Sequence, residues 1–222
     1  QMCIRDSNLR LARFGRERGI PTYYYIAPKV WAWKESRVKK IRRWVDRLFV
    51  IFPFEVEYFR RRGIEAIYEG NPLMDAIDAR RAALGSKEEF RAVHGLDGRP
   101  VVACLAGSRR SEIGYNLPFM VELSGRFPQY QFVVAGVPWL DRSVYEPLIA
   151  SSPVRYVCDA TYELLAHSEA AVVTSGTATL ETALLGTPEM VCYRRDWPSM
   201  LIGKMFLKTK YVSLVNLSLI HI

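Results

Sequence analysis

The chain has 222 residues, half of them hydrophobic and 12% aromatic, so it can form one large domain or two smaller ones and does not have the composition of a disordered protein. No apolar run approaches the ~20 residues of a membrane-spanning helix, and the first residues lack the apolar stretch of a secretory signal. The net charge of +8 is concentrated in residues 34–47, which hold seven basic and two acidic residues.

The first part of the chain predicts short strands alternating with helices. Aromatic and aliphatic runs typical of strands occupy residues 22–27, 47–52 and 65–70. Helical patterns occupy residues 34–45, 54–62, 75–84 and 87–94. Pro53 is favoured at the start of the second of these helices, and Gly63 at its end. Residues 95–100 contain two glycines and a proline, so we expect a turn-rich break there.

A second alternating series begins with the continuous apolar run 101–107, as expected for a strand covered on both faces. Further strands are predicted at 131–136, 154–158, 170–174 and 189–193. Helices are predicted at 111–126, 139–150, 160–167, 178–185 and 197–207. This alternation is typical of parallel sheets with helices on both faces, so the sequence predicts two α/β units that meet near residues 95–100.

Two predicted strands end in small polar residues. In open parallel sheets, ligands bind beyond the carboxyl ends of the strands. Gly107 and Ser108 follow the strand 101–107, and Arg109 comes next, with Glu112 one turn further on. Small residues let a ligand approach the backbone, and arginine binds phosphate in a bidentate manner. The alternative is an ordinary strand-to-helix turn with a surface arginine.

The second strand end follows residues 170–174. It contains Ser175, Gly176, Thr177, Ala178 and Thr179. The unpaired N–H groups and partial positive charge of a helix N-terminus would favour a diphosphate there. A carboxylate at position 181, about one turn inside the helix, could hold sugar hydroxyls. The alternative is that the hydroxyls and this carboxylate only cap the helix.

Other polar and aromatic groups give weaker indications. The four cysteines form no CxxC pair and the three histidines no ligand spacing, so we expect no metal site and a reducing, cytoplasmic environment. Trp31 and Trp33 follow a strand, where they could line an apolar acceptor pocket or, as aromatic residues more often do, pack inside the domain. The basic segment 34–47 could face anionic lipid, nucleic acid or a phosphorylated substrate, or be a solvated helix surface.

Four stretches resemble the lipid-A-disaccharide synthases, inverting glycosyltransferases of family 19 with the glycosyltransferase B fold. They are "YYYIAPKVWAWKESRVKKIRR", "FVIFPFEVEYFRRRGIEAIYEGNPLMD", "LAGSRRSEI" and "TSGTATLETALLGTPEMVCYR". Their order and spacing agree with the family from Asn8 to Leu217. The resemblance implies two Rossmann-like domains: an incomplete acceptor-side domain at 8–95 and a UDP-sugar-binding domain at 100–217. Residues 1–7 and 218–222 do not resemble the family, and we expect them to be non-native tails of a fragment that lacks both ends.

The resemblance also implies an activity. The family transfers 2,3-diacylglucosamine from its UDP derivative to 2,3-diacylglucosamine 1-phosphate, which forms the β-1,6 lipid A disaccharide and releases UDP without a metal or other cofactor. Glu112, in the stretch "LAGSRRSEI", is also expected among the UDP-sugar-binding residues. Gly107, Ser108 and Arg109, together with the loop from Ser175 to Thr179, would face the UDP phosphates, while Glu181 would hold the ribose. Acylated substrates imply an enzyme on the inner face of the inner membrane, and the basic segment would then contact anionic lipid.

Some residues depart from the family pattern. Asn71 replaces the usual histidine ahead of Pro72, in a region expected at the acceptor or between the domains, and Ala106 replaces the usual proline. Asn71 can donate a hydrogen bond but cannot carry a charge. The family's proposed general base lies in an N-terminal region that this sequence does not match, so Asp6 is not assigned that role. We therefore expect a fragment with little or no activity.

Two alternatives stay open from the sequence. One is another UDP-sugar enzyme of the same architecture, such as a UDP-N-acetylglucosamine epimerase or a cell-wall glycosyltransferase, although the "PKVWAW" and "PFE" stretches argue against it. The other is a non-enzymatic basic module that binds nucleic acid, which would rest on charge alone because no recognition motif is present.

Overall fold

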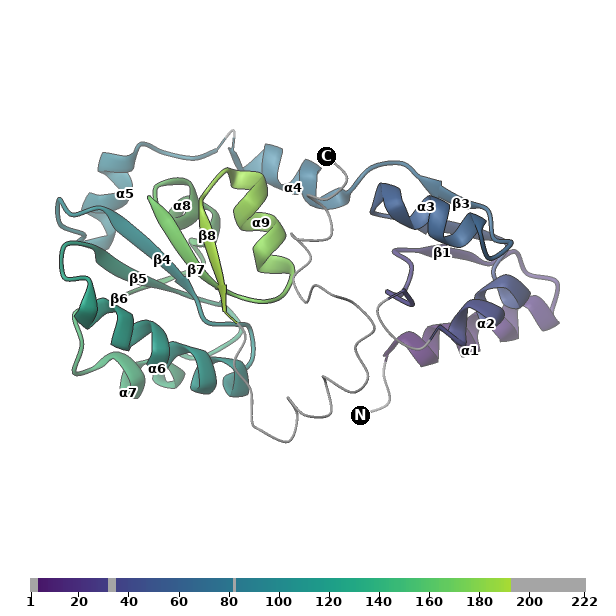
Figure 1. Ribbon diagram of the computed structural model, residues 1–222, viewed down its shortest axis with the longest axis horizontal. Helices are drawn as coiled ribbons and strands as arrows, with labels where there is room; N and C mark the ends of the chain where they lie inside the picture. Colours follow the sequence, from purple (N-terminus) through teal and green to yellow (C-terminus); the bar gives the residue numbers. More distant parts are fainter. Residues whose placement is uncertain (1–3, 32–34, 82, 193–222) are drawn as a thin grey trace. The chain divides into compact units, whose positions relative to one another are not determined.

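The computed structural model describes residues 4–31, 35–81 and 83–192. These residues form two compact units, one extending to Pro72 and the other beginning at Leu73 (Figure 1). Both units contain parallel strands connected by helices, as the alternation in the sequence predicted. The last predicted helix, at 197–207, lies outside the described residues.

The first unit is built on a three-stranded parallel sheet in the order β1-β2-β3. The strands are β1 (Tyr23–Tyr25), β2 (Arg47–Val50) and β3 (Ala66–Tyr68). The helices are α1 (Ile4–Glu17), α2 (Arg37–Trp44) and α3 (Pro53–Arg60). Leu48 of β2 packs in a common core with Ile41 of α2 and Phe59 of α3, all of which are almost completely buried. The burial of this apolar face is what holds the small sheet together.

Helix α1 is not among the elements that the sequence predicted, and it begins at Ile4, within the segment 1–7 that the sequence set apart. Its residues Leu9 and Ala12 are buried. Arg16, near its end, forms an ion pair with Asp46, which also accepts a hydrogen bond from the Thr22 backbone N–H at 2.8 Å. These contacts with distant parts of the chain stabilise a helix that local pattern did not reveal.

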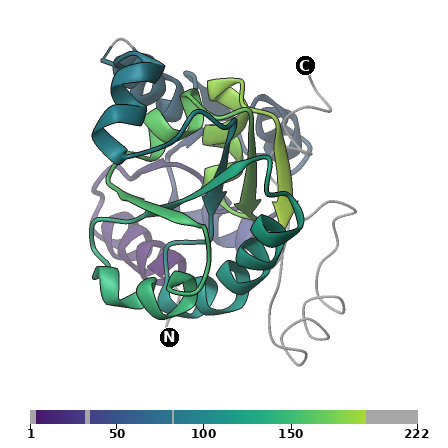
Figure 2. The same cartoon turned by 90° about the vertical axis from the view of Figure 1, so that its left-hand side faces the viewer.

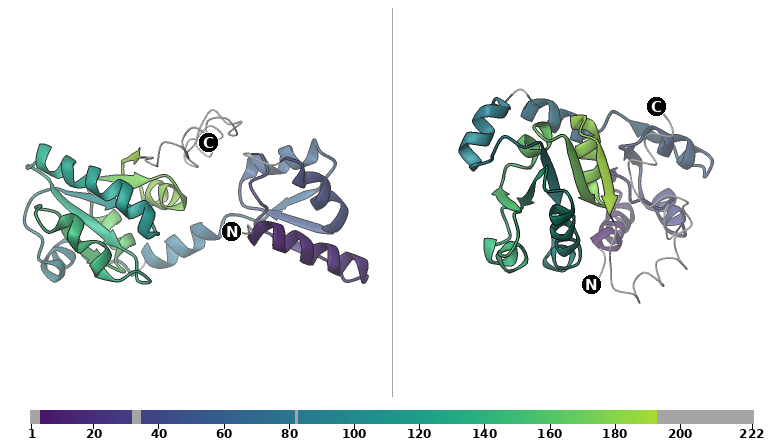
Figure 3. Two further views of the ribbon diagram at one scale, coloured as in Figure 1. Left: turned by 90° about the horizontal axis from the view of Figure 1, so that it is seen from below. Right: turned by 60° about the vertical axis from the view of Figure 1, so that its left-hand side comes forward.

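The second unit is built on a five-stranded parallel sheet in the order β6-β5-β4-β7-β8. The strands are β4 (Val101–Leu105), β5 (Gln131–Gly136), β6 (Arg155–Cys158), β7 (Ala170–Thr174) and β8 (Glu189–Cys192). The helices are α4 (Pro72–Arg81), α5 (Lys87–His94), α6 (Arg110–Arg126), α7 (Glu146–Ile149), α8 (Thr161–Ala166) and α9 (Thr177–Leu185). Helices cover both faces of this sheet (Figure 2, Figure 3).

Each face of the five-stranded sheet has its own apolar core. Side chains of α5, α8 and α9 pack on one face, and side chains of α6 and α7 pack on the other. All five residues of β4 are buried, as the continuous apolar run 101–107 predicted for a strand covered on both sides. The central strand is therefore fixed from both faces, and the loop that follows it starts from a rigid base.

The division between the units lies earlier in the chain than the sequence placed it, at 72/73 rather than near 95–100. Helices α4 and α5 group with the second unit because their side chains contact it. The Arg81 guanidinium donates to the Leu184 carbonyl at 2.9 Å, and Lys87 pairs with Glu169 at 3.0 Å. Phe90 of α5 is buried in the core of the five-stranded sheet. The break at 95–100 is only a turn, beginning with the left-handed Gly95 that ends α5.

The single helix predicted at 139–150 is wrong. The structure contains a short 3-10 turn at Arg142–Val144 and then the one-turn helix α7. Asp141 caps the first turn by accepting a hydrogen bond from the Ser143 backbone N–H at 2.8 Å. Pro147 lies in the first turn of α7. Because proline has no N–H, it is compatible with a helix start and not with a continuous helix through this point.

Candidate functional site

The two polar strand ends singled out in the sequence lie next to each other in the second unit. Strands β4 and β7 are neighbours, and Leu105 pairs with Val173 in the ladder. After β4 the chain continues to β5 and β6 on one side of the sheet, and it later adds β7 and β8 on the other side. The loops after β4 and β7 therefore diverge at the topological switch point, where open parallel sheets bind ligands.

The loop after β4 is held by Glu112, the third residue of α6. Its Oε2 accepts a hydrogen bond from the Ser108 backbone N–H, and its Oε1 accepts one from the Arg109 guanidinium, both at 3.0 Å. Gly107 has a φ of 118°, and a Cβ at this position would lie 2.6 Å from Glu112 Cβ. This turn thus requires glycine for both its backbone conformation and its close approach to the glutamate.

Arg109 remains accessible although it contacts Glu112. Its side chain is 72% exposed, whereas that of Glu112 is 24% exposed. An ion pair this exposed contributes little stability, so the guanidinium can turn towards another anion at small cost. The structure therefore separates the roles within the predicted motif: Glu112 shapes the turn, and Arg109 is the group that an anion could reach.

The loop after β7 is anchored at its start and open at its centre. The Ser175 backbone N–H donates to the Cys192 carbonyl at 3.0 Å. Gly176 is extended and directly precedes α9, and a Cβ there would meet no atom outside its immediate neighbours closer than 3.9 Å. The chain itself does not require glycine at this position. The absence of a side chain instead leaves the backbone open beside Thr177, the exposed first residue of the helix.

Two residues of this loop face inward. The Thr179 side chain is fully buried, and its hydroxyl donates to the Gly176 carbonyl at 2.8 Å. Ala178 packs against the core of the sheet. The structure therefore places the Thr179 hydroxyl within the helix end rather than at the open side of the loop, whereas Gly176 and Thr177 are exposed.

Glu181 lies in α9 and accepts a hydrogen bond from Tyr162 of α8, which the sequence did not indicate. The phenol donates to Glu181 Oε1 at 2.9 Å. Burial, and next the hydrogen bond to the carboxylate, raise the pKa of Tyr162 to about 12. The phenol is therefore protonated at neutral pH and acts as a donor. Its position just after the predicted strand 154–158 is the one sequence signal that could have identified it.

Trp139, in the loop after β5, is a second residue that the sequence did not single out. Its indole N–H donates to the Ser108 carbonyl at 3.1 Å, yet the residue is 67% exposed. A large exposed aromatic side chain at the carboxyl edge of a sheet adds an apolar surface beside the β4 loop. It also restrains the loop residue that precedes Arg109.

Of the four residues predicted near an acceptor or between the domains, Trp31 has the best-defined contacts. Its indole N–H donates to Glu55 Oε1 at 2.9 Å, and its ring packs edge-on against Phe54. Glu55 is 1% exposed, and burial raises the pKa of its carboxyl group. This environment favours the packing interpretation of Trp31. Trp33 lies outside the described residues.

Asn71 and Pro72 lie at the chain junction between the two units. Pro72 is the first residue of α4, where its missing N–H is tolerated, and Asn71 directly precedes it. Both are partly buried. The geometry gives Pro72 a role in starting α4 and does not by itself assign a ligand to either residue.

The basic segment 34–47 includes all of α2. Arg37 at its start is buried and so is not available to a surface partner. Four cationic side chains of the helix are exposed: Lys39, Lys40, Arg42 and Arg43. The segment is thus a cationic surface over most of α2, and Lys34 lies outside the described residues.

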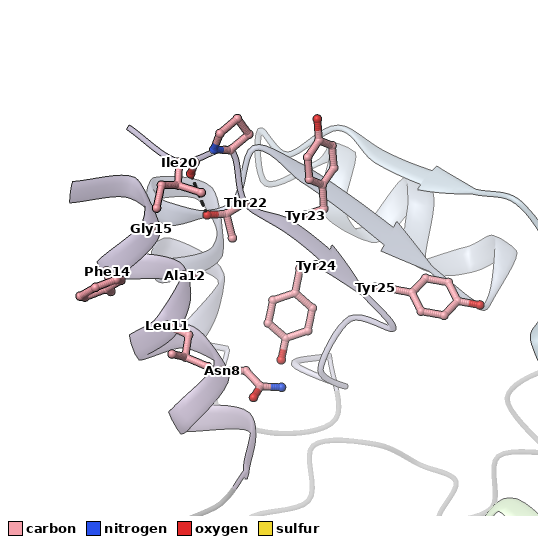
Figure 4. A pocket seen from close by; sticks show the side chains of 11 residues that line it. Asn8, Leu11, Ala12, Phe14, Gly15, Ile20, Thr22, Tyr23, Tyr24 and Tyr25 are labelled. Carbon is pink, nitrogen blue, oxygen red and sulfur yellow. Dashed lines mark hydrogen bonds between the residues drawn. The ribbon is translucent and has the colours of Figure 1, made fainter. Parts of the chain in front are cut away.

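A cavity of about 500 Å³ lies in the first unit, between α1 and β1 (Figure 4). Its walls are mainly apolar and aromatic and include Leu11, Phe14 and Tyr24. Two of the lining residues are hydrogen-bonded to each other, since the Thr22 hydroxyl donates to the Ile20 carbonyl at 3.3 Å. Among the described residues that line it, there is no aspartate, glutamate, histidine, lysine or arginine.

Within the part of the chain that the structure describes, no group of three His, Cys, Asp or Glu side chains is arranged to hold a metal ion. None of the described helices combines the length and apolar character needed to span a membrane.

Comparisons with known proteins identify the family. A family model described as Lipid-A-disaccharide synthetase matches residues 2–221, including most of the two end segments 1–7 and 218–222. A lipid-A-disaccharide synthase of Syntrophus aciditrophicus is 40% identical over 220 residues, covering 96% of this chain and 56% of the relative. One from Geobacter sulfurreducens is 37% identical over 219 residues, with the same coverage. The chain thus spans about half the length of these relatives.

Solved structures show the same fold. A UDP-GlcNAc 2-epimerase from Neisseria meningitidis bound to UDP-GlcNAc matches with a TM-score of 0.55 and 16% identity, over 86% of this chain and 57% of that one. An S. aureus MnaA–UDP co-structure matches with a TM-score of 0.59 and 13% identity, over 94% and 61%. These likenesses concern the fold alone, whereas the family match and the 40% identity concern the sequence itself. With its two parallel α/β units, its paired loops at the switch point and this match over residues 2–221, the chain belongs to the lipid-A-disaccharide synthetase family.

Proposed function

We propose that this chain carries the UDP-sugar-binding part of a lipid-A-disaccharide synthase. The reaction transfers 2,3-diacylglucosamine from its UDP derivative to 2,3-diacylglucosamine 1-phosphate, forms the β-1,6 disaccharide and releases UDP. The observation that carries the proposal is the adjacency of the β4 and β7 loops at the switch point of the five-stranded sheet. Family membership supplies the identity of the nucleotide and sugars.

The two loops offer complementary groups to a diphosphate. Arg109 is exposed and charged, and Gly107 and Ser108 bring the β4 backbone to the same edge. The N-terminus of α9 supplies unpaired N–H groups and a partial positive charge beside Gly176 and Thr177. Negative charge grows on UDP as the glycosidic bond breaks, and preorganised cationic and N–H groups would stabilise it.

The remaining loop residues have supporting roles in this proposal. Thr179 and Ala178 hold the α9 turn in place, and Glu112 holds the β4 turn. Ser175 begins the β7 loop, and Glu181, one turn inside α9, would accept hydrogen bonds from the ribose. Trp31, Trp33, Asn71 and Pro72 remain proposed on the acceptor side or between the domains, and the contacts of Trp31 with Glu55 and Phe54 support a packing role for it.

A nucleotide titration tests the proposal. UDP should raise the melting temperature of the chain, and Arg109→Ala should weaken UDP binding by roughly ten- to a hundredfold, the worth of a charge-assisted phosphate contact. Arg126→Ala is a matched control, since Arg126 is an exposed arginine that pairs with Glu122 at the other end of α6. Equal UDP affinity of the two variants would refute the phosphate assignment, and tight salt-sensitive nucleic-acid binding without a UDP response would favour the basic-module alternative.

We also propose that the exposed cations of α2 contact an anionic membrane surface, which would place a full-length enzyme on the inner face of the inner membrane. Each Lys or Arg near such a surface contributes about 1 kcal/mol. The chain should therefore bind vesicles that contain phosphatidylglycerol and not neutral vesicles, and the variant Lys39→Glu/Lys40→Glu should lose this binding. Binding that neither lipid charge nor this variant changes would rule out the contact.

A further inference from the structure

The strongest feature that the proposed function leaves unused is the contact between Tyr162 and Glu181. Tyr162 is the second residue of α8 and therefore belongs to the segment that follows β6 at the sheet edge. Glu181 belongs to α9, which follows β7. β6 and β7 are not neighbours, because β5 and β4 lie between them. The hydrogen bond thus joins two segments of the carboxyl edge that the sheet itself does not connect.

The geometry leaves one side of the carboxylate available. The phenol occupies Oε1 at 2.9 Å, and within the described part of the chain no hydrogen bond to Oε2 is present. Neither residue is fully exposed or fully buried. A glutamate side chain has three rotatable bonds, and one strong donor restricts the carboxylate to a small set of orientations.

The Tyr162 phenol is suited to act as a permanent hydrogen-bond donor to the Glu181 carboxylate. The raised pKa of the phenol keeps it protonated across the neutral range, so it gives one hydrogen bond and does not compete for protons with a ligand. Arg80 of α4 lies close enough to lower the pKa of the same phenol, which opposes part of the effect of burial and of Glu181.

We propose that Tyr162 is a positioning residue that orients Glu181 for the ribose hydroxyls of the nucleotide, an inference that rests on the proposed function of this site. Tyr162 does not touch the reacting atoms. It fixes one carboxylate oxygen so that the other points to the sugar, and it couples the segment after β6 to the occupancy of the nucleotide site.

The test compares UDP with 2′,3′-dideoxy-UDP, which lacks both ribose hydroxyls that a carboxylate could accept. Tyr162→Phe should weaken UDP binding by about five- to tenfold, which is less than the full worth of a hydrogen bond to a charged group because Glu181 keeps its charge and loses only its fixed orientation. It should leave binding of the dideoxy nucleotide unchanged. Tyr130→Phe is the control, because Tyr130 is a partly buried tyrosine that precedes β5 at the opposite edge of the same sheet. It should change neither affinity.

Non-additivity provides the second readout. If Tyr162 acts only through Glu181, the variant Tyr162→Phe/Glu181→Ala should bind UDP no more weakly than Glu181→Ala alone. Equal losses for UDP and the dideoxy nucleotide in Tyr162→Phe, or additive losses in the double variant, would overturn the positioning role while leaving the nucleotide site intact. A wild-type chain that binds neither nucleotide would refute the proposed site itself, and the inference with it.

Discussion

Replacing Gly107 by alanine tests whether the β4 turn is shaped as the structure shows. The backbone at this position has a φ of 118°, and an added Cβ would lie 2.6 Å from Glu112 Cβ and 2.8 Å from its Oε2. An L-residue in such a conformation costs about 1–3 kcal/mol. Moving Glu112 aside also weakens the hydrogen bond that it accepts from the Ser108 N–H. A hydrogen bond to a charged group is worth about 1.5–3 kcal/mol, and this one is worth less because it lies at an exposed edge. We therefore expect a loss of about 2–4 kcal/mol.

The measurement is urea unfolding of the chain in parallel with Gly125→Ala. Gly125 is exposed within α6, and a Cβ there would meet no atom within 4 Å. The control should be neutral or more stable by about 0.5–1 kcal/mol, because alanine has the higher helix propensity. Gly107→Ala should also reduce the UDP response, since the turn presents Arg109. If the two variants have equal unfolding free energies, the described turn is not the one that the protein adopts.

Three further experiments, two with substitutions and one with a thiol reagent, test other parts of the structure. Trp31→Phe removes an indole donor from buried Glu55, whose pKa burial raises, so it should cost about 1–3 kcal/mol, and urea unfolding at several pH values should show a cost that increases as rising pH ionises the carboxyl group. Burial raises the pKa of Glu189 to about 7, and its buried carboxylate oxygens have no hydrogen-bond partner among the described residues. Because the pKa of Glu189 is raised in the folded chain, the protonated side chain contributes stability that is lost as pH rises through 7. Glu189→Gln should therefore stabilise the fold by about 1 kcal/mol at pH 8.5, a value reduced because the side chain is partly exposed. The same substitution should have almost no effect at pH 4.5. Exposed Cys158 should react with a maleimide in the folded chain, whereas Cys104, fully buried and with its pKa raised by burial, should react only on unfolding, as peptide mass mapping would show.

Some elements of the fold can be predicted from local sequence alone. Strand 131–136 and helix 87–94 have the bounds that the sequence predicts, because an apolar run and a helical pattern followed by a glycine are local signals. In the structure, Ser86 and Glu89 form a capping box at the start of this helix, in which each side chain accepts a hydrogen bond from the backbone N–H of the other residue. Pro147 in α7 is also a local signal, although the pattern around it favours a continuous helix.

Other features depend on contacts between distant segments, and local pattern carries no information on them. Helix α1 is held by side chains from α2 and the segment after it, and α4 and α5 join the second unit through Arg81, Lys87 and Phe90. Trp139 and Tyr162 reach their partners across 31 and 19 residues of sequence. Neither hydrophobic periodicity nor a short motif indicates which distant residues form such contacts.

The sequence by itself determined which residues stand at the strand ends: the glycine, serine and arginine after β4, and the glycine and hydroxyl residues after β7, with Glu181 beyond them. Those local choices also carried the family resemblance. Only the tertiary structure decided that the two loops are neighbours, because the strand order β6-β5-β4-β7-β8 depends on the crossover that carries the chain from β6 at one edge to β7 beside β4. It also decided which residues of each loop face outward. Arg109 and Thr177 are exposed, whereas packing turns Thr179 inward, since a buried hydroxyl must find its partner within the fold.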